Sequence, residues 1–212
     1  MAPIGALTVP PSAEDAACMP LTIPNLLTVF RLLAAPAVAL VFVALPRPAA
    51  DLWALGLFLG ASFTDFLDGW LARRFDQQTE FGRMLDPIAD KAMVMTALAV
   101  VMMLAGPDPW MIPPAAAIFL RETAVSGLRE HLAGRVSIPV TKLAKWKTTV
   151  QMAAIGVLMG GFWAGAGGWP AAAGPVGAAG IALLWLAGVL TLLTGWDYFR
   201  RGLASHAMTG ER

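Results

Sequence analysis

Two pairs of aspartates are spaced so that each pair lies on one face of a helix. Asp65 and Asp68 are three residues apart near the end of an apolar segment, and Asp86 and Asp90 are four residues apart near the start of the next. Side chains at these spacings are neighbours on a helix. A short connection joins the two segments, so two antiparallel helices would bring all four carboxylates to one depth. We therefore expect a single cluster of four acids.

Such a cluster predicts a site for divalent metal ions. Four ionised carboxylates repel one another strongly unless a cation lies among them. Cys18 is the only cysteine and the chain has two histidines, so the ligands would be oxygen atoms, which favours Mg²⁺ or Mn²⁺. One or two such ions suit phosphoryl chemistry. The alternative is that the acids cap helix ends or pair with Arg73, Arg74 and Lys91.

The segments that must position the acids are long and apolar. Of the 212 residues, 58% are hydrophobic and 14% are charged, whereas a soluble domain carries about 25% charged residues. About 20 apolar residues span a bilayer. Six such segments follow one another along the chain, at residues 26–45, 52–72, 87–105, 110–130, 148–164 and 176–199. The sequence therefore predicts an all-α polytopic membrane protein with six transmembrane helices.

The connections between these segments differ in charge. Basic residues gather in alternate connections and after the last segment, at Arg73, Arg74, Arg83, Lys91, Arg129, Arg135, Lys142, Lys145, Lys147, Arg200, Arg201 and Arg212. The opposite side has one basic residue, Arg47, and the tryptophans Trp53, Trp110, Trp163 and Trp169. Basic residues mark the cytoplasmic side and tryptophans mark membrane interfaces. Both termini are therefore predicted to be cytoplasmic.

The remaining stretches are predicted to be tails and a loop. Residues 1–20 are rich in proline and alanine and lack the basic start of a secretory signal peptide, so we expect a flexible tail. Residues 21–201 would form one domain, followed by a short tail at 202–212. The glycine- and alanine-rich stretch 164–180 is interpreted as a short outer loop with packing of helices through small residues, not as a site.

The residues around the acids complete a longer pattern. Asp65-x2-Asp68-Gly69-x2-Ala72-Arg73-x8-Gly82-x3-Asp86-x3-Asp90 resembles, at every fixed position, the signature of the CDP-alcohol phosphotransferases. The glycines would let a backbone approach a ligand closely, and Arg73 offers a planar fork for phosphate. The resemblance implies a six-helix, usually dimeric, metal-dependent membrane enzyme that displaces CMP from a CDP-linked lipid by an alcohol.

Three further segments resemble the bacterial phosphatidylglycerophosphate synthases of that family. They are Ile23 to Thr28 with Arg31, Arg121-Glu122 with Ser126 to Arg129, and Lys142 to Gln151. The resemblance implies transfer of a phosphatidyl group from CDP-diacylglycerol to glycerol 3-phosphate by a homodimer in the bacterial inner membrane, facing the cytoplasm, with no nucleic-acid partner. The alternative acceptors are inositol phosphate, serine and phosphatidylglycerol. A divalent-cation transporter is the alternative from another class.

The resemblance also implies a role for each matching residue. Asp65, Asp68, Asp86 and Asp90 would hold two Mg²⁺ or Mn²⁺ ions, and Asp90 would be the general base. The CDP-lipid would contact Asn25, Thr28, Arg31, Asp68, Gly69, Ala72, Arg73, Thr79 and Gly82.

The acceptor phosphate needs basic residues. Arg121 lies inside an apolar segment, where an unpaired charge is costly, and Lys142, Lys145 and Lys147 gather at the start of the fifth. We expect these four residues to bind the acceptor phosphate. The alternative for the lysines is a role in membrane topology or in attracting anionic lipid headgroups.

Overall fold

The computed structural model describes residues 22–75, 79–132 and 142–209, without the side chains of residues 66, 68–73, 75, 83, 129–132, 142–145 and 201–209. Within these residues all regular secondary structure is α-helical, which confirms the predicted all-α architecture. The helices are α1 (Ile23–Ala44), α2 (Ala49–Phe75), α3 (Glu80–Ala105), α4 (Ile112–Leu132), α5 (Lys142–Ala166) and α6 (Pro170–Thr209).

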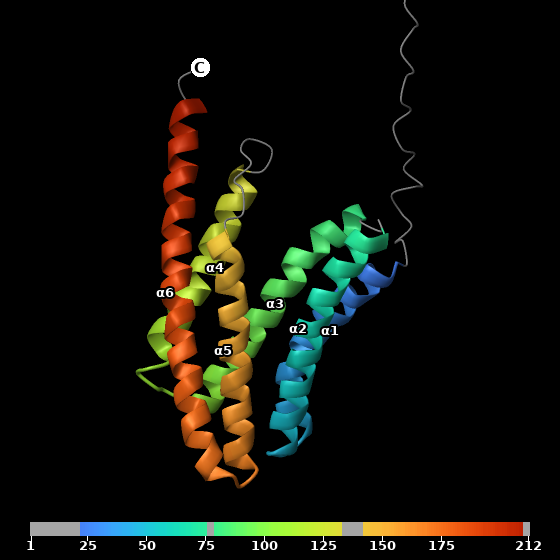
Figure 1. Ribbon diagram of the computed structural model, residues 1–212, viewed down its shortest axis with the longest axis vertical. Helices are drawn as coiled ribbons and strands as arrows, with labels where there is room; N and C mark the ends of the chain where they lie inside the picture. The colour runs from blue at the N-terminus through green and yellow to red at the C-terminus, as the bar shows by residue number, and fades with distance from the viewer. Residues whose placement is uncertain (1–21, 76–78, 133–141, 210–212) are drawn as a thin grey trace, which may run out of the picture.

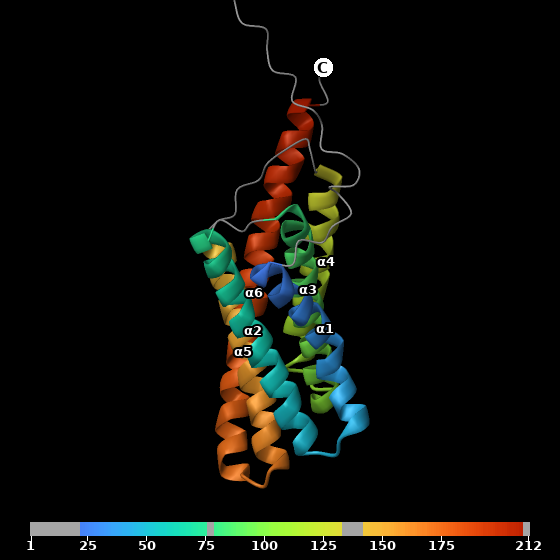
Figure 2. The ribbon, with the colours of Figure 1, turned by 90° about the vertical axis from the view of Figure 1, so that its right-hand side faces the viewer.

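Helix α3 lies between the α1–α2 pair and the group formed by α4, α5 and α6 (Figure 1). Helix α1 packs against both α2 and α3, while α6 packs along α5 and also against α4. Figure 2 shows the helices running roughly along the long axis of the molecule. The start of α1, the end of α2, the start of α3, the end of α4 and the start of α5 all lie toward one end (Figure 1). Residues from five helices can therefore meet there.

Small side chains fill much of the core between the helices. Ala35, Ala54, Ala61, Ala97 and Ala154 are all fully buried. Alanine at a contact lets two helix backbones approach closely, which is how helices pack in membranes. The outward faces carry large apolar side chains instead, including Leu33, Leu40, Phe63, Leu120 and Leu192. Such an apolar outer surface is suited to lipid.

Among the residues that the structure describes, four helical stretches are long and apolar enough to cross a membrane, namely α1, α3, Trp146–Ala166 of α5 and Pro170–Arg200 of α6. The chain is thus a multi-pass membrane protein. Helices α2 and α4 are not in this group, and both contain charged residues. Several of those charges face the protein interior: Asp51 is 2% exposed, and the Arg121 and Glu122 side chains are 12% and 13% exposed.

The start of α3 differs from the prediction, in which the third apolar segment began at residue 87. The helix begins at Glu80, because Thr79 caps it: the Thr79 hydroxyl oxygen accepts a hydrogen bond from the Gly82 backbone nitrogen at 3.0 Å. Such a cap satisfies a backbone donor that has no partner within the helix. Pro87 consequently lies inside α3, and Asp86 and Asp90 lie one turn or more beyond its start.

The outer loop predicted at 164–180 is much shorter than expected, while the expected packing of small residues is present: a Cβ atom on Gly161 would lie 3.3 Å from the backbone nitrogen of Gly177. Helix α5 continues to Ala166 and α6 begins at Pro170, so most of this stretch is helical. Gly168 makes the turn between them with a φ of 83°, a conformation that glycine adopts without strain. Alanine favours the helix intrinsically, which explains why the stretch is not a loop. At its C-terminal end α6 reaches Thr209, so helix covers most of the segment predicted as a C-terminal tail. The predicted N-terminal tail, residues 1–20, lies outside the described residues.

Arg47 is the one basic residue predicted for the non-cytoplasmic side, and it lies at the end of the molecule opposite the acids. The Arg47 guanidinium Nε lies 2.8 Å from a carboxylate oxygen of the buried Asp51, one turn along the chain. Local pairing therefore accounts for this arginine. Trp163 and Trp169 meet edge to face nearby, with ring centroids 5.2 Å apart.

Candidate active site

Arg31 joins one acid from each predicted pair. Its side chain comes from α1 and is 2% exposed. One guanidinium nitrogen, Nη1, lies 2.7 Å from Asp65 Oδ1 of α2 and also donates to Asp90 Oδ1 of α3. Since both carboxylates contact the same nitrogen, the end of α2 and the first turns of α3 bring together two of the four acids that were expected to cluster.

Asp86 is held by the same face of α1. The buried Thr28 hydroxyl donates a hydrogen bond to Asp86 Oδ1 at 2.6 Å. Thr28 and Arg31 are three residues apart on α1, and their partners Asp86 and Asp90 are one turn apart on α3. This double contact fixes how α1 lies along α3. The side chains of Asp68, Gly69, Ala72 and Arg73 lie outside the described residues.

Three of the predicted CDP-lipid contacts meet at the start of α3. The Thr79 hydroxyl donates to Asn25 Oδ1 at 2.9 Å, and the Gly82 nitrogen donates back to that hydroxyl. A Cβ atom on Gly82 would lie 2.7 Å from Asn25 Oδ1. Gly82 is therefore needed for the close approach of α1, a reason that the sequence pattern did not reveal.

The acids have the right chemistry for Mg²⁺ or Mn²⁺, which bind oxygen ligands. Among the side chains that the structure describes, no three histidine, cysteine, aspartate or glutamate residues are close enough to form a metal site. Asp65 and Asp90 nevertheless converge on one cationic nitrogen, and their side chains are 46% and 49% exposed. Convergent carboxylates that solvent can reach fit a divalent cation.

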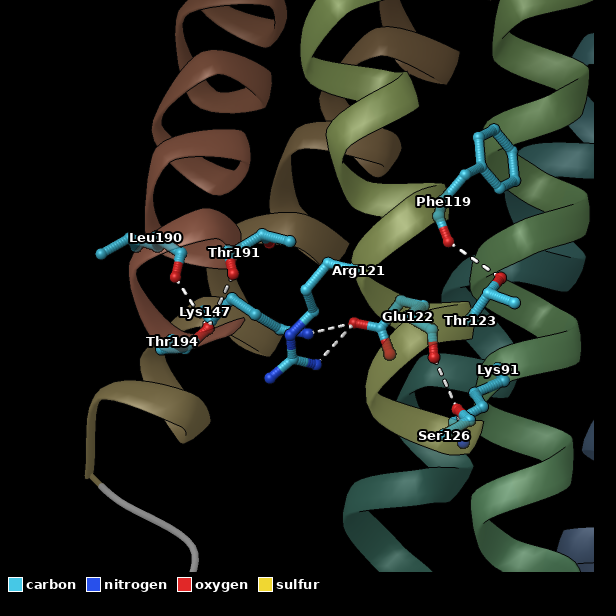
Figure 3. A network of polar contacts seen from close by, with 10 residues as sticks. All are labelled: Lys91, Phe119, Arg121, Glu122, Thr123, Ser126, Lys147, Leu190, Thr191 and Thr194. Carbon is cyan, nitrogen blue, oxygen red and sulfur yellow. Dashed lines mark hydrogen bonds and ion pairs between the residues drawn. The ribbon is translucent and has the colours of Figure 1, made fainter. Parts of the chain in front are cut away.

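A second charged cluster joins α4 and α5. Glu122 Oε1 lies 3.2 Å from Arg121 Nη1 and also accepts from Lys147 Nζ. Figure 3 shows Arg121 and Lys147 both pointing toward this carboxylate. Helix α6 packs against the arginine, because a Cβ atom on Gly195 would lie 2.9 Å from Arg121 Cγ. One carboxylate shared by two cations leaves the cluster with a net positive charge.

Lys91 connects the acids to this second cluster. Its Nζ atom donates to the Ser126 hydroxyl, which in turn donates to the backbone oxygen of Glu122 at 2.5 Å (Figure 3). Lys91 directly follows Asp90 in the sequence and was considered as a partner for the acids. The structure pairs it with α4 instead.

A cavity of about 320 Å³ lies between α3, α4 and α5 and contains residues of both clusters. Asp86, Asp90 and Lys91 line it from α3, Arg121, Glu122 and Ser126 from α4, and Lys147, Thr148 and Gln151 from α5. The structure thus brings Arg121 and Lys147 to the same cavity as two of the acids. The side chains of Lys142 and Lys145 lie outside the described residues.

The predicted site residues did not include five polar residues that line this cavity: Lys91, Glu122, Ser126, Thr148 and Gln151. Helical spacing could have identified two of them. Ser126 is four residues after Glu122, and Gln151 is four residues after Lys147, so each lies on the same face as a charged residue of the cavity.

The CDP-alcohol phosphatidyltransferase family matches residues 21–193 of the chain. The chain belongs to this family. Members are transferases of phospholipid synthesis that generally depend on a divalent metal, which agrees with the convergent acids at the start of α3. The match covers nearly all of the domain predicted at 21–201.

Relatives in the family come from several bacteria and share one name, CDP-diacylglycerol–glycerol-3-phosphate 3-phosphatidyltransferase. The protein of Cereibacter sphaeroides is 47% identical over 211 residues, covering 86% of this chain and 96% of the relative. That of Rickettsia bellii is 41% identical over 179 residues, covering 84% and 93%. That of Escherichia coli K12 is 41% identical over 186 residues, covering 85% and 94%. The family and subfamily resemblance predicted from the motifs is confirmed.

Proposed function

We propose that the protein transfers the phosphatidyl group of CDP-diacylglycerol to glycerol 3-phosphate, giving phosphatidylglycerophosphate and CMP. The observation that carries this proposal is the cavity that has Asp86 and Asp90 on one wall and Arg121 and Lys147 on the others. Both substrates are anionic, so the reaction needs positive charge near each of them. The names of the relatives support the same reaction.

The donor would bind at the acidic end of the cavity. Asp65, Asp68, Asp86 and Asp90 would hold two Mg²⁺ or Mn²⁺ ions, which supply charge neutralisation at the diphosphate of the CDP-lipid. The remaining donor contacts are proposed from the family signature and from α1: Asn25, Thr28, Arg31, Gly69, Ala72, Arg73, Thr79 and Gly82. Arg73 would pair with phosphate as a bidentate fork.

Asp90 would act as the general base. It lines the cavity and its side chain is half exposed, so an acceptor hydroxyl can reach it. Asp90 takes the proton of that hydroxyl, whose oxygen forms a bond to the lipid-linked phosphorus. The bond from this phosphorus to the CMP oxygen breaks, and CMP leaves with the electron pair. Arg31 holds Asp90 in place during proton transfer.

The acceptor phosphate would bind at the basic end. Arg121 and Lys147 are proposed as its main contacts, with Lys142 and Lys145 at the start of the same helix. The Nε atom of Arg121 is buried and has no hydrogen-bond partner in the described part of the chain. A phosphate oxygen would accept from it, so the arginine can bind the ligand while it remains paired with Glu122.

The family signature and the charge pattern together support an arrangement in the membrane. We propose six membrane-spanning helices in the bacterial inner membrane, cytoplasmic termini, a cavity that faces the cytoplasm and assembly as a homodimer. The predicted cytoplasmic side is the end where α2 and α3 bring the acids together. Reporter fusions after Arg212 and within the α3–α4 connection test the orientation, and a cytoplasmic signal from the latter would contradict it.

The reaction is tested by measuring CMP release from CDP-diacylglycerol by the purified, detergent-solubilised protein. Release should require glycerol 3-phosphate, stop when EDTA removes the metal, and be lost in Asp90→Asn. Asp108→Asn makes the same chemical change outside the cavity and should retain the activity. Metal-dependent release only with inositol phosphate, serine or phosphatidylglycerol would overturn the proposed acceptor. No release with any of these alcohols would overturn the proposed reaction.

A further inference from the structure

Gln151 is a buried polar residue for which the proposed mechanism gives no role. It lies on α5 and lines the cavity, and the residue is only 2% exposed. Its side-chain oxygen, Oε1, is buried and has no hydrogen-bond partner within the described residues. Buried polar atoms nearly always have a partner, because an unsatisfied one loses its hydration without compensation. This oxygen therefore lacks a hydrogen-bond donor that a ligand could supply.

The surroundings of Gln151 define which ligand group could supply that donor. Lys147 lies one helical turn before it on the same face of α5 and pairs with Glu122. Ser126, across the cavity, already donates to a backbone oxygen and accepts from Lys91. Val94 and Val125 also line the cavity and offer no polar group, while Thr148 lines it and already has an interaction partner. A hydroxyl that is neither at the phosphate nor at the base would thus find its acceptor at Gln151.

Two buried side-chain atoms of the cavity have no hydrogen-bond partner among the described residues, and they are chemically different. Arg121 Nε is a donor and suits a phosphate oxygen, whereas Gln151 Oε1 is an acceptor and suits a hydroxyl. A phosphate dianion has no proton to offer Gln151. Together the two atoms match a small molecule with a phosphate and a hydroxyl besides the reacting one.

We infer that Gln151 is a specificity-determining contact, whose side-chain oxygen accepts a hydrogen bond from the non-reacting hydroxyl of a polyol phosphate. This inference rests on the proposed function and deepens it: Arg121 and Lys147 bind the phosphate, Asp90 takes the proton of the primary hydroxyl, and Gln151 selects for the secondary hydroxyl. A site that hydrogen-bonds a substrate hydroxyl discriminates against the analogue that lacks it.

The test compares kcat/KM for glycerol 3-phosphate and for 3-hydroxypropyl phosphate, which keeps the phosphate and the primary hydroxyl but lacks the secondary one. The wild type should prefer glycerol 3-phosphate by about tenfold to a hundredfold, as expected for one neutral hydrogen bond in a buried site. Gln151→Met keeps the size of the side chain and removes its polar atoms. It should lower kcat/KM for glycerol 3-phosphate to that of the analogue and leave the analogue within about twofold.

Two further variants separate this contact from a structural role. Gln151→Glu keeps an acceptor oxygen at the same position, so the preference ratio should persist even if the added charge slows both substrates. Thr149→Val makes a polar-to-apolar change on α5 at a residue that does not line the cavity, and it should leave the ratio unchanged. If Gln151→Met does not fold, loss of the ratio in Gln151→Glu overturns the inference and retention supports it.

The outcomes also separate the inference from the proposed function. If wild-type protein forms no lipid product with glycerol 3-phosphate, the proposed function fails. If it does, but Gln151→Met keeps the wild-type preference or lowers both substrates equally, the proposed function stands and the role of Gln151 is refuted.

Discussion

Replacing Arg31 by methionine tests how α1 holds the acids of the site. Arg31→Met keeps a long side chain in a nearly fully buried position but removes the positive charge that Asp65 and Asp90 share. In the absence of metal, two carboxylates would then face each other without a cation between them. We expect the variant to be less stable than the wild type in EDTA.

The expected size of this loss follows from the exposure of the groups. A hydrogen bond to a charged group contributes about 1.5–3 kcal/mol, and Arg31 makes two with one nitrogen. Both carboxylates are nearly half exposed, so water compensates part of the loss, and removing a buried charge is itself favourable. A net loss of about 2 kcal/mol is therefore reasonable. For a chain of this length it lowers the melting temperature by about 4–8 °C.

The assay is thermal unfolding of the detergent-solubilised protein in EDTA and in Mg²⁺ or Mn²⁺. Because a divalent cation can replace the missing charge, metal should raise the melting temperature more in Arg31→Met than in the wild type. Arg47→Met removes an arginine paired with Asp51 at the other end of the molecule, and its deficit should not depend on metal.

Two results would refute this reasoning. An unchanged melting temperature in EDTA would mean that the Arg31 pairs contribute nothing to stability. A deficit of equal size with and without metal would mean that Arg31 and the cation do not act on the same carboxylates.

Two other changes test the packing and the charge balance of the site. Gly82→Ala places a Cβ atom 2.7 Å from Asn25 Oδ1. Overpacking of this kind costs about 1–3 kcal/mol, so the melting temperature should fall. A melting temperature equal to that of the wild type would contradict the close approach of α1. Glu122→Gln leaves the buried Arg121 and Lys147 without their shared carboxylate, which should destabilise the protein by about 3 kcal/mol. Added glycerol 3-phosphate should raise the melting temperature of this variant more than that of the wild type, because its phosphate replaces the lost charge, and an equal rise in both would argue against phosphate binding there.

Properties that depend on residues close together in the chain were predictable from the sequence. Apolar stretches long enough to span a bilayer gave the helices, because the hydrophobic pattern of a helix is local. The spacing of Asp65 with Asp68 and of Asp86 with Asp90 set the chemistry of the site for the same reason. Boundaries were less predictable. The start of α3 depends on the Thr79 cap, and the start of α6 lies in a stretch that mixes alanine, which favours helices, with glycine, which disfavours them.

The tertiary structure decided which distant residues meet. Arg31 was expected to contact the CDP-lipid substrate. In the structure, α1 packs against both α2 and α3, and this packing brings the Arg31 guanidinium into contact with Asp65 and Asp90. Arg121 and Lys147 are far apart in the sequence and share Glu122 because α4 and α5 line the same cavity. The unsatisfied oxygen of Gln151 likewise depends on what neighbouring helices fail to supply. Helical periodicity fixes the face of a side chain, but only helix packing fixes what that face meets.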